Sequence, residues 1–283
     1  MSGYQPVTGT PSPALAHDAG RTRQSLLADL RALGVRSGQV LLVHASMRSI
    51  GPVQGGSAAV VAALSDAVGF EGTLAVPAGT AGNSDTSRHY LARTAGMTAE
   101  QISRYMAEMR PFDPATTPAE GMGQIAAQVR TTPGARRSAH PQSSFAALGP
   151  MAGKLTDRHA MDCHLGESSP LARLYEIGAW ILLLGVGYPA CSAFHLAEYR
   201  YVANPPTRSY RCVIAADGRP VWHEYRDVVL DDTGFGHLGA DFDRIGLAAR
   251  GRVGRADCRL VPMVPIVDFA TKWFRQHRSA TGL

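Results

Sequence analysis

The sequence predicts an α/β fold, and two observations along the chain carry this prediction. Apolar runs at residues 40–44, 72–77 and 180–185 have the length and composition of buried strands, and the first suits a parallel sheet. Between the first two runs lie a glycine-punctuated loop and a helical stretch rich in alanine and valine. Strand, glycine loop, helix and strand in this order make a βαβ unit, whose ligands usually bind at the carboxyl edge of the sheet.

The elements around this unit follow from helix and turn signals. Leucines at helical spacing within residues 21–33, followed by Gly34, predict a first helix with a glycine stop. Ser57 is expected to cap the helix at 57–68. Three further helices are expected, at residues 98–109, 120–129 and 194–201.

Two segments outside the helices have distinct signatures. Residues 210–225 alternate in polarity around an Asp217-Gly218 turn, which is typical of a β-hairpin. Residues 78–119 are mostly polar and broken, so this stretch resembles an active-site insertion more than a layer of the core.

The composition predicts one compact soluble domain. Of 283 residues, 45% are hydrophobic, which is enough for one large core or two closely packed lobes. Residues 1–17 are rich in Pro, Gly, Ser and Thr, so we expect a flexible tail ahead of a single domain at 18–283. The chain lacks the pattern of a signal peptide and any run of about 18 apolar residues, so neither export nor a membrane span is expected.

Charge and cysteine usage limit the partners. The net charge of +5 comes mostly from scattered arginines, which does not indicate a nucleic-acid partner but would help to attract a polyanionic cofactor. The four cysteines are irregularly spaced, so reduced thiols in the cytoplasm are expected. The ten histidines show no dense ligand spacing, and we expect no metal site.

The sharpest group of chemical side chains is Ser192, His195 and Glu198 in CSAFHLAEYR. His and Glu three residues apart share one face of a helix, where the carboxylate can hold the imidazole in one tautomer and make it a better base. The structural alternative is a capped helix with a half-buried histidine, because His-x-x-Glu is a short and common pattern.

Three other positions have two readings each. His140, before Pro141, is predicted to be extended with its ring facing a cleft, or else to satisfy a loop carbonyl. His44 ends the first strand at the ligand-binding edge, where a structural hydrogen bond is equally compatible. Cys163 beside His164 suggests a thiolate nucleophile, but adjacent side chains rarely face one another.

Nearly the whole chain, from about residue 41 to 269, resembles the aminoglycoside 3-N-acetyltransferases. The resemblance rests on eight blocks in the right order: LLVHASMRSIGPVQGG, EGTLAVP, GNSD, FDPATTPAEGMGQIA, RSAHPQSSFAALG, HLGESSPLARLYE, LLLGVGY and FHLAEYR. Each block alone is a weak signal, whereas the ordered set is specific.

The resemblance implies a three-layer α/β/α fold with a mixed central sheet and a deep cleft between two closely packed lobes. It implies direct acetyl transfer from acetyl-CoA to the 3-amino group of a 2-deoxystreptamine aminoglycoside, in a monomer or homodimer. His195 would be the base, Glu198 its supporting carboxylate and Ser192 a hydroxyl that stabilises the oxyanion. The residues implied to bind the cofactor are His44, Ser46, Met47, Arg48, Ser49, Ile50 and Gly55, and those implied to bind the aminoglycoside are Asp85, Glu120, His140 and Glu198.

The chain departs from the family's pattern in two places. Cys191 and Ser192 stand where many members carry Asn-Thr, although Ser192 keeps a hydroxyl. The segment at 231–243 is less acidic than is usual, which leaves the identity of the antibiotic open. Two other functions stay open: acetylation of a different amine, such as a biosynthetic intermediate, and drug sequestration without chemistry, against which the His195–Glu198 pair and the glycine loop argue.

Overall fold

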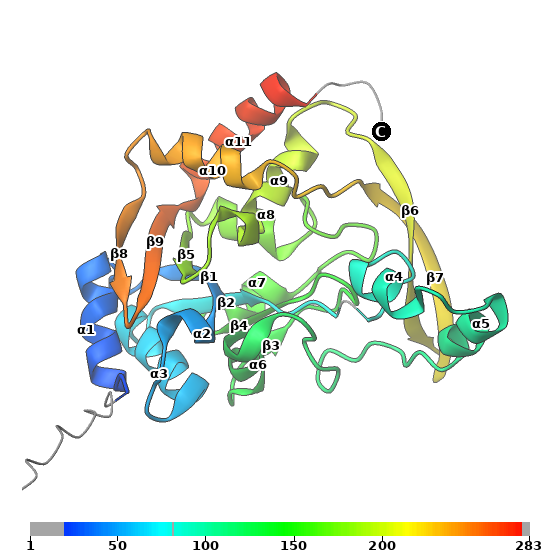
Figure 1. The fold of residues 1–283 in the computed structure, drawn as a ribbon, viewed down its shortest axis with the longest axis horizontal. Coiled ribbons are helices and arrows are strands. Elements are labelled where there is room, and N and C mark those ends of the chain that lie inside the picture. The colour runs from blue at the N-terminus through cyan, green and yellow to red at the C-terminus, as the bar shows by residue number, and fades with distance from the viewer. Residues whose placement is uncertain (1–19, 81, 279–283) are drawn as a thin grey trace, which may run out of the picture.

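A seven-stranded mixed sheet forms the centre of the computed structural model, which describes residues 20–80 and 82–278 (Figure 1). The strand order is β3-β4-β2-β1-β5-β9-β8. In the middle, β1 (Val40–Ala45) pairs in parallel with both β2 (Thr73–Pro77) and β5 (Trp180–Leu184). The outer strands pair antiparallel: β3 (Arg136–Arg137), β4 (Phe145–Leu148), β8 (Ala249–Val253) and β9 (Ala256–Pro262).

Helices cover both faces of this sheet because successive strand residues point to opposite sides. Leu41 and Val43 pack in one hydrophobic core, and Leu42 packs in the other. The first core includes α1 (Arg23–Leu33), α3 (Gly56–Val68) and α6 (Gly123–Thr131). The second includes α7 (Ala152–Thr156), α8 (Pro170–Glu176), α9 (Ala193–Arg200), α10 (Phe235–Asp243) and α11 (Met263–His277). The predicted three-layer α/β/α arrangement is therefore confirmed.

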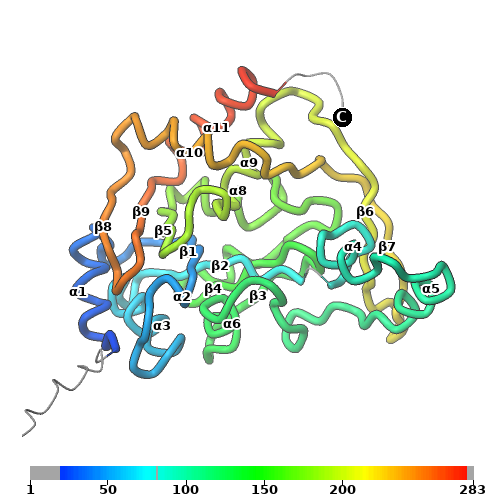
Figure 2. Tube along the Cα trace, viewed as in Figure 1, coloured from blue at the N-terminus to red at the C-terminus, as the bar shows by residue number. Residues whose placement is uncertain are grey.

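A long hairpin and the predicted insertion lie together at the end of the molecule opposite α1 (Figures 1 and 2). The hairpin strands β6 (Thr207–Ala216) and β7 (Arg219–Val228) turn at Asp217 and Gly218, whose φ angles of 50° and 74° are left-handed as a tight hairpin turn requires. The insertion contributes α4 (Arg88–Thr94) and α5 (Ala99–Ala107). Asn83 joins the two, since its side chain hydrogen bonds to the backbone N and O of Val213 at 2.6 and 2.9 Å.

The structure corrects two expectations about the glycine loop. Ser57 does not cap a helix, because α3 begins one residue earlier, after an N-cap at Gly55 without a side-chain cap. Gly55 and Gly56 have φ angles of 80° and 58°, a backbone path that glycine adopts readily. The loop also contains the short helix α2 (Met47–Ile50), which the sequence did not indicate.

Other predicted boundaries shifted by a few residues, as with α6, which starts at Gly123 rather than at residue 120. The 3₁₀ turn η1 (Tyr188–Ala190) connects β5 to α9. The predicted flexible tail at 1–17 lies outside the described residues. Among those residues, no helix is both long and apolar enough to cross a membrane.

Candidate active site

His195 and Glu198 lie one helical turn apart on α9 and contact each other directly. The His195 Nδ1 to Glu198 Oε2 distance is 2.6 Å, and Glu198 is only 1% exposed. A buried carboxylate at this distance accepts the Nδ1 proton, so the lone pair of the imidazole lies on Nε2. The structure therefore brings together the pair that the sequence predicted, in the geometry of an oriented general base.

The second oxygen of Glu198 is held by groups far away in the sequence. Glu198 Oε1 accepts hydrogen bonds from the Asp231 backbone N–H at 3.0 Å and from Arg278 Nη1 at 2.5 Å. Arg278 follows α11, and its guanidinium lies 3.9 Å from the centre of the Phe274 ring. These donors compensate the buried charge of Glu198, which would otherwise be costly.

Asp231 adds a second negative charge close to His195. Burial raises the pKa of the Asp231 carboxyl, but hydrogen bonds from Thr233 and the charges of Arg278 and His195 outweigh this and lower the pKa below its ordinary value. His195 thus lies close to two carboxylates, those of Glu198 and Asp231.

Ser192 and His44 form a second polar pair where β5 and β1 end. Ser192 Oγ lies 3.3 Å from His44 Nε2. Burial lowers the pKa of His44 to about 4, and repulsion from His195 contributes to the shift, so His44 is neutral near pH 7. Both residues line a cavity of about 330 Å³ with Val43, Ala45, Val76, Pro77, Gly121, Met122, Ile125, Ala126, Val186 and Ala190.

The predicted cofactor loop presents backbone amides beside this cavity. Ser46 Oγ caps α2 by accepting the Ser49 N–H at 3.3 Å, and Ser46 N donates to Leu184 O. Within the described ranges, the amides of Met47, Arg48, Ser57 and Ala58 have no hydrogen-bond acceptor. A neighbouring hollow of about 320 Å³ shares Val186 with the first cavity and is lined by Ser49, Gly185, Gly187, Arg255, Ala256, Asp257 and Arg259. Free N–H donors at helix starts suit a polyanionic ligand such as the diphosphate of acetyl-CoA.

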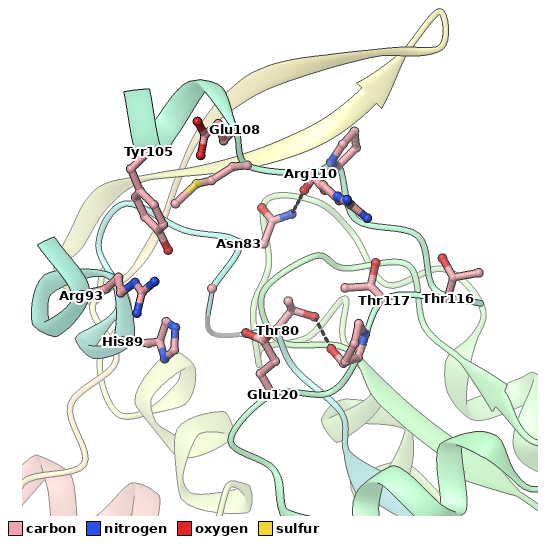
Figure 3. Close-up of a pocket in the computed structure, with 14 residues that line it drawn as sticks. Thr80, Asn83, His89, Arg93, Tyr105, Glu108, Arg110, Thr116, Thr117 and Glu120 are labelled. Atoms are coloured by element: carbon pink, nitrogen blue, oxygen red, sulfur yellow. Dashed lines mark hydrogen bonds between the residues drawn. The ribbon is translucent and has the colours of Figure 1, made fainter. Parts of the chain in front are cut away.

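A larger cavity of about 620 Å³ is lined by residues of the insertion, from Thr80 to Glu120 (Figure 3). Its lining includes Thr80 and Glu120, whereas Pro77 and Gly121 line the cavity of His44 and Ser192. Glu120 and Gly121 are consecutive, so two neighbouring residues of this segment each line one of the cavities. Glu120, which was predicted to contact the substrate, lines this cavity, and its role stays a prediction.

The structure places Asp85 and His140 away from the cavity linings. Asp85 Oδ2 lies 2.5 Å from Arg211 Nη2, so its charge is already paired with the hairpin. His140 is fully buried, and its Nδ1 accepts the backbone N–H groups of Gln142 and Ser143 at 3.2 Å. The expectation that the His140 ring faces a cleft is wrong, because the chain after Pro141 folds back over it.

The sequence did not reveal that His140 belongs to a buried cluster at the base of the hairpin. Its ring centre lies 4.7 Å from that of His159 and 4.8 Å from that of His164. His164 Nδ1 lies 2.8 Å from Asp227 Oδ2, and Tyr225 Oη lies 2.9 Å from His164 Nε2. Asp227 and Tyr225 are more than 60 residues from His164 in the chain, so no local spacing could have indicated these two partners.

Cys163 shows none of the features of a nucleophile. Its side chain is buried, and burial raises the pKa of the thiol to about 11. The neighbouring His164 ring is engaged with Asp227, so it does not serve the thiol as a base.

Comparison with known proteins shows the family to which the chain belongs. The model of the aminoglycoside 3-N-acetyltransferase family matches residues 42–275. The chain belongs to this family. The prophage-derived aminoglycoside N(3′)-acetyltransferase-like protein YokD of Bacillus subtilis (strain 168) is 37% identical over 255 residues, covering 90% of this chain and 92% of that protein. The crystal structure of YokD superposes with a TM-score of 0.86 at 36% identity, over 93% of this chain and 96% of the other.

Two further solved members of the family are complexes. AAC-IIIb in a binary complex with CoASH has a TM-score of 0.79 at 29% identity, covering 93% of this chain and 99% of that one. AAC-VIa bound to sisomicin has a TM-score of 0.79 at 30% identity, covering 92% of this chain and 100% of that one. The predicted family, enzyme class and acetyl donor are confirmed: the chain is an acetyltransferase of the acetyl-CoA-dependent type.

Proposed function

We propose that this enzyme transfers an acetyl group from acetyl-CoA to the 3-amino group of a 2-deoxystreptamine aminoglycoside, which inactivates the antibiotic. The observation that carries the proposal is the His195 Nδ1 to Glu198 Oε2 contact of 2.6 Å, which leaves Nε2 as the proton acceptor. An amino group is protonated at neutral pH and must lose protons to attack a thioester, so the reaction needs an oriented base. The family's description as aminoglycoside 3-N-acetyltransferases and the sisomicin complex of AAC-VIa support an aminoglycoside as the acceptor.

The ammonium group would first release one proton to solvent, and His195 would accept a second proton from the attacking nitrogen as the new C–N bond forms. The imidazolium that results lies against the Glu198 carboxylate and close to Asp231, both of which stabilise its positive charge. As the C–S bond breaks, the imidazolium returns the proton to the departing thiolate. The products are the N-acetylated amine and free coenzyme A, and the enzyme ends in its starting protonation state.

Ser192 would stabilise the negative charge that develops on the thioester oxygen. His44 is neutral near pH 7, so its Nε2–H can donate to Ser192 Oγ and leave the Ser192 O–H to point into the cavity. A donor aimed at the oxyanion contributes about 2.7–4 kcal/mol of transition-state stabilisation in well-studied hydrolases.

The acetyl donor would lie across the loop at 46–56, with its diphosphate on the free amides of Met47, Arg48, Ser57 and Ala58. Ser46, Ser49 and Ile50 would shape this surface, and Gly55 would permit close approach through its left-handed backbone. Val186 lines both the neighbouring hollow and the cavity of His44 and Ser192, so the donor would extend past Val186 into that cavity.

The acceptor would enter from the cavity that Glu120 lines, with its amine directed towards Glu198 and His195. Asp85 and His140, implied by the resemblance to bind substrate, would act indirectly, by fixing the hairpin beside this cavity. The four described cysteines are free and buried, which supports a cytoplasmic location.

Replacing the base tests the proposal. We expect His195→Ala to lower kcat by about two to four orders of magnitude, because a general base contributes a factor of that size. Thiol release from acetyl-CoA with a panel of aminoglycosides and other amines measures the rate, and melting temperature checks the fold. A kcat close to that of the wild type in a folded variant would show that His195 is not the base. If the wild-type enzyme acetylated other amines but no aminoglycoside, the proposed acceptor would be wrong.

A further inference from the structure

The side chain of Arg278 is committed to the two acidic residues beside His195. Its Nη1 lies 2.5 Å from Glu198 Oε1, and its Nη2 donates to the Asp231 backbone O at 2.5 Å. The Asp231 carboxylate Oδ2 lies 3.8 Å from the same Nη2. The Arg278 side chain is only 18% exposed, and its guanidinium lies over the Phe274 ring, so solvent screens this charge only weakly.

Fastening the end of α11 to α9 does not depend on this guanidinium. Arg275 binds the carbonyl groups at the end of α9, since its Nε donates to Tyr201 O at 2.8 Å and its Nη2 to Arg200 O at 3.3 Å. The rings of Tyr201 and Phe274 also meet, with their centres 6.1 Å apart, where α11 lies beside α9 (Figure 1). The contacts of Arg275 therefore serve the helix junction, whereas those of Arg278 lead to the catalytic pair.

Titratable groups from four different elements act on the pair of His195 and Glu198: His44 at the end of β1, Tyr210 on β6, Asp231 after β7 and Arg278 after α11. Burial lowers the pKa of His44 to about 4 and raises the pKa of the Tyr210 hydroxyl, so neither group is charged near pH 7. Asp231 is ionised and adds negative charge. Among these four groups, Arg278 therefore supplies the positive charge.

The guanidinium and the imidazole lie on opposite oxygens of one carboxylate. Glu198 Oε1 contacts Arg278, and Oε2 lies 2.6 Å from His195 Nδ1. A positive charge on Oε1 favours the ionised carboxylate, which keeps the imidazole proton on Nδ1 and the lone pair on Nε2. The same charge disfavours a second positive charge on the ring. His195 thus releases a bound proton at a lower pH than it would between two uncompensated carboxylates.

We propose that Arg278 is a positioning residue for the base, which through Glu198 keeps His195 neutral and able to accept a proton at the pH where the enzyme works. This inference rests on the proposed role of His195 as the base. Arg278 does not touch the reacting atoms, and its effect is carried by charge. A unit charge separated from the imidazole by one carboxylate in a partly buried site corresponds to a shift of roughly one pH unit.

The test follows kcat/KM for kanamycin A against pH, by thiol release at saturating acetyl-CoA. Arg278→Met removes the charge but keeps an unbranched stem over the Phe274 ring, and we expect the acidic limb of the profile to move up by roughly one pH unit. Arg278→Lys restores the charge and should return the limb to within about 0.3 pH unit of the wild type. The acceptor ionises identically in every assay, so a shift of the limb belongs to the enzyme.

Arg275→Gln is the matched control, because it removes a guanidinium from the same end of α11 that binds only carbonyl groups of α9. Its acidic limb should stay where it is in the wild type. Melting temperature checks the fold of each variant. If Arg278→Met does not fold, Arg278→Gln takes its place with the same expected shift, since glutamine also removes the charge.

An acidic limb that stays in place without the charge, or that moves equally in the methionine and lysine variants, would overturn the inference. A uniform loss of kcat/KM at every pH would also overturn it, because a contact that only shapes the site does not move the limb. Titration of the His195 ring by NMR, with isotope-labelled histidine, needs no turnover and separates this inference from the proposed acceptor. A higher midpoint in Arg278→Met than in the wild type supports the inference, and equal midpoints refute it.

Discussion

Replacing Glu198 with glutamine tests whether the carboxylate sets the protonation of His195. The substitution keeps the size of a side chain that is 1% exposed and removes only its charge and one acceptor. The glutamine oxygen has two donors to satisfy, Asp231 N–H and Arg278, so its amide NH₂ turns towards His195 Nδ1. Nδ1 must then accept a hydrogen bond, which places the imidazole proton on Nε2 and abolishes the base.

This geometry sets the size of the effects on kcat and on stability. An imidazole in the wrong tautomer costs about 10²–10⁴ in kcat, with little change in the KM for acetyl-CoA. Breaking a buried ion pair costs about 3–5 kcal/mol, and the retained oxygen reduces this to about 1–3 kcal/mol here. For a domain of this size, that loss lowers the melting temperature by roughly 3–10 °C.

The assay pairs thiol-release kinetics with thermal melting, and Glu167→Gln serves as the control. Glu167 pairs with Arg200 through two hydrogen bonds of 2.6 and 2.8 Å, but its side chain is 58% exposed. The control should therefore lose less than about 1 kcal/mol and keep its kcat. Activity of Glu198→Gln within about threefold of wild type, in a folded protein, would refute the tautomer argument, because the geometry allows no other orientation that satisfies Arg278.

Three further outcomes are expected. Gly55→Val should raise the KM for acetyl-CoA more than that for the acceptor, because φ is 80° there; an equal rise in both, with a lowered melting temperature, would mean a general fold defect. Cys163→Ala should stay active, since its thiol is buried and its pKa is raised, and an isolated acetyl-enzyme that acetylates the acceptor would contradict this. Burial lowers the pKa values of His44, His140 and His159, so these rings stay neutral in the folded protein between pH 6.5 and about 4, where the same rings bind protons in the unfolded chain. The free energy of unfolding should therefore fall as the pH drops through this range, by up to about 4 kcal/mol per pH unit. Urea unfolding at pH 7 and pH 5 measures this fall, and equal stabilities would show that these rings are solvated.

Local geometry explains what the sequence could predict. His195 and Glu198 are three residues apart, so a helix alone places them together. His44 was expected at the carboxyl edge because it ends a central strand, and Ser192 follows the neighbouring strand β5. These inferences needed only the period of an element and the order of strands.

Tertiary packing decided the rest. Arg278 is 80 residues from Glu198 in the chain, and nothing in the composition of α11 indicates that its end reaches α9. His140 was read as a cleft residue because its flanking Pro141 and polar neighbours are typical of loops, but His159 and His164 enclose it. Ser57 has the chemistry of a helix cap, yet the backbone of the preceding glycines starts the helix too early for it to act as one.

The guanidinium that compensates Glu198 lies just beyond the last helix, α11, and this ties the chemistry to a locally weak part of the molecule. On the helix side, the Arg278 N–H bonds to Phe274 O and the guanidinium lies over the Phe274 ring, while its Nη2 donates to Asp231 O across the site. Helix ends open locally at free energies far below that of global unfolding. Each such opening withdraws the counter-charge from Glu198 while the sheet and both cores stay intact. On warming, the enzyme should therefore lose activity at a lower temperature than the one at which the fold melts. The temperature of inactivation would then reflect the local opening of the last turn of α11.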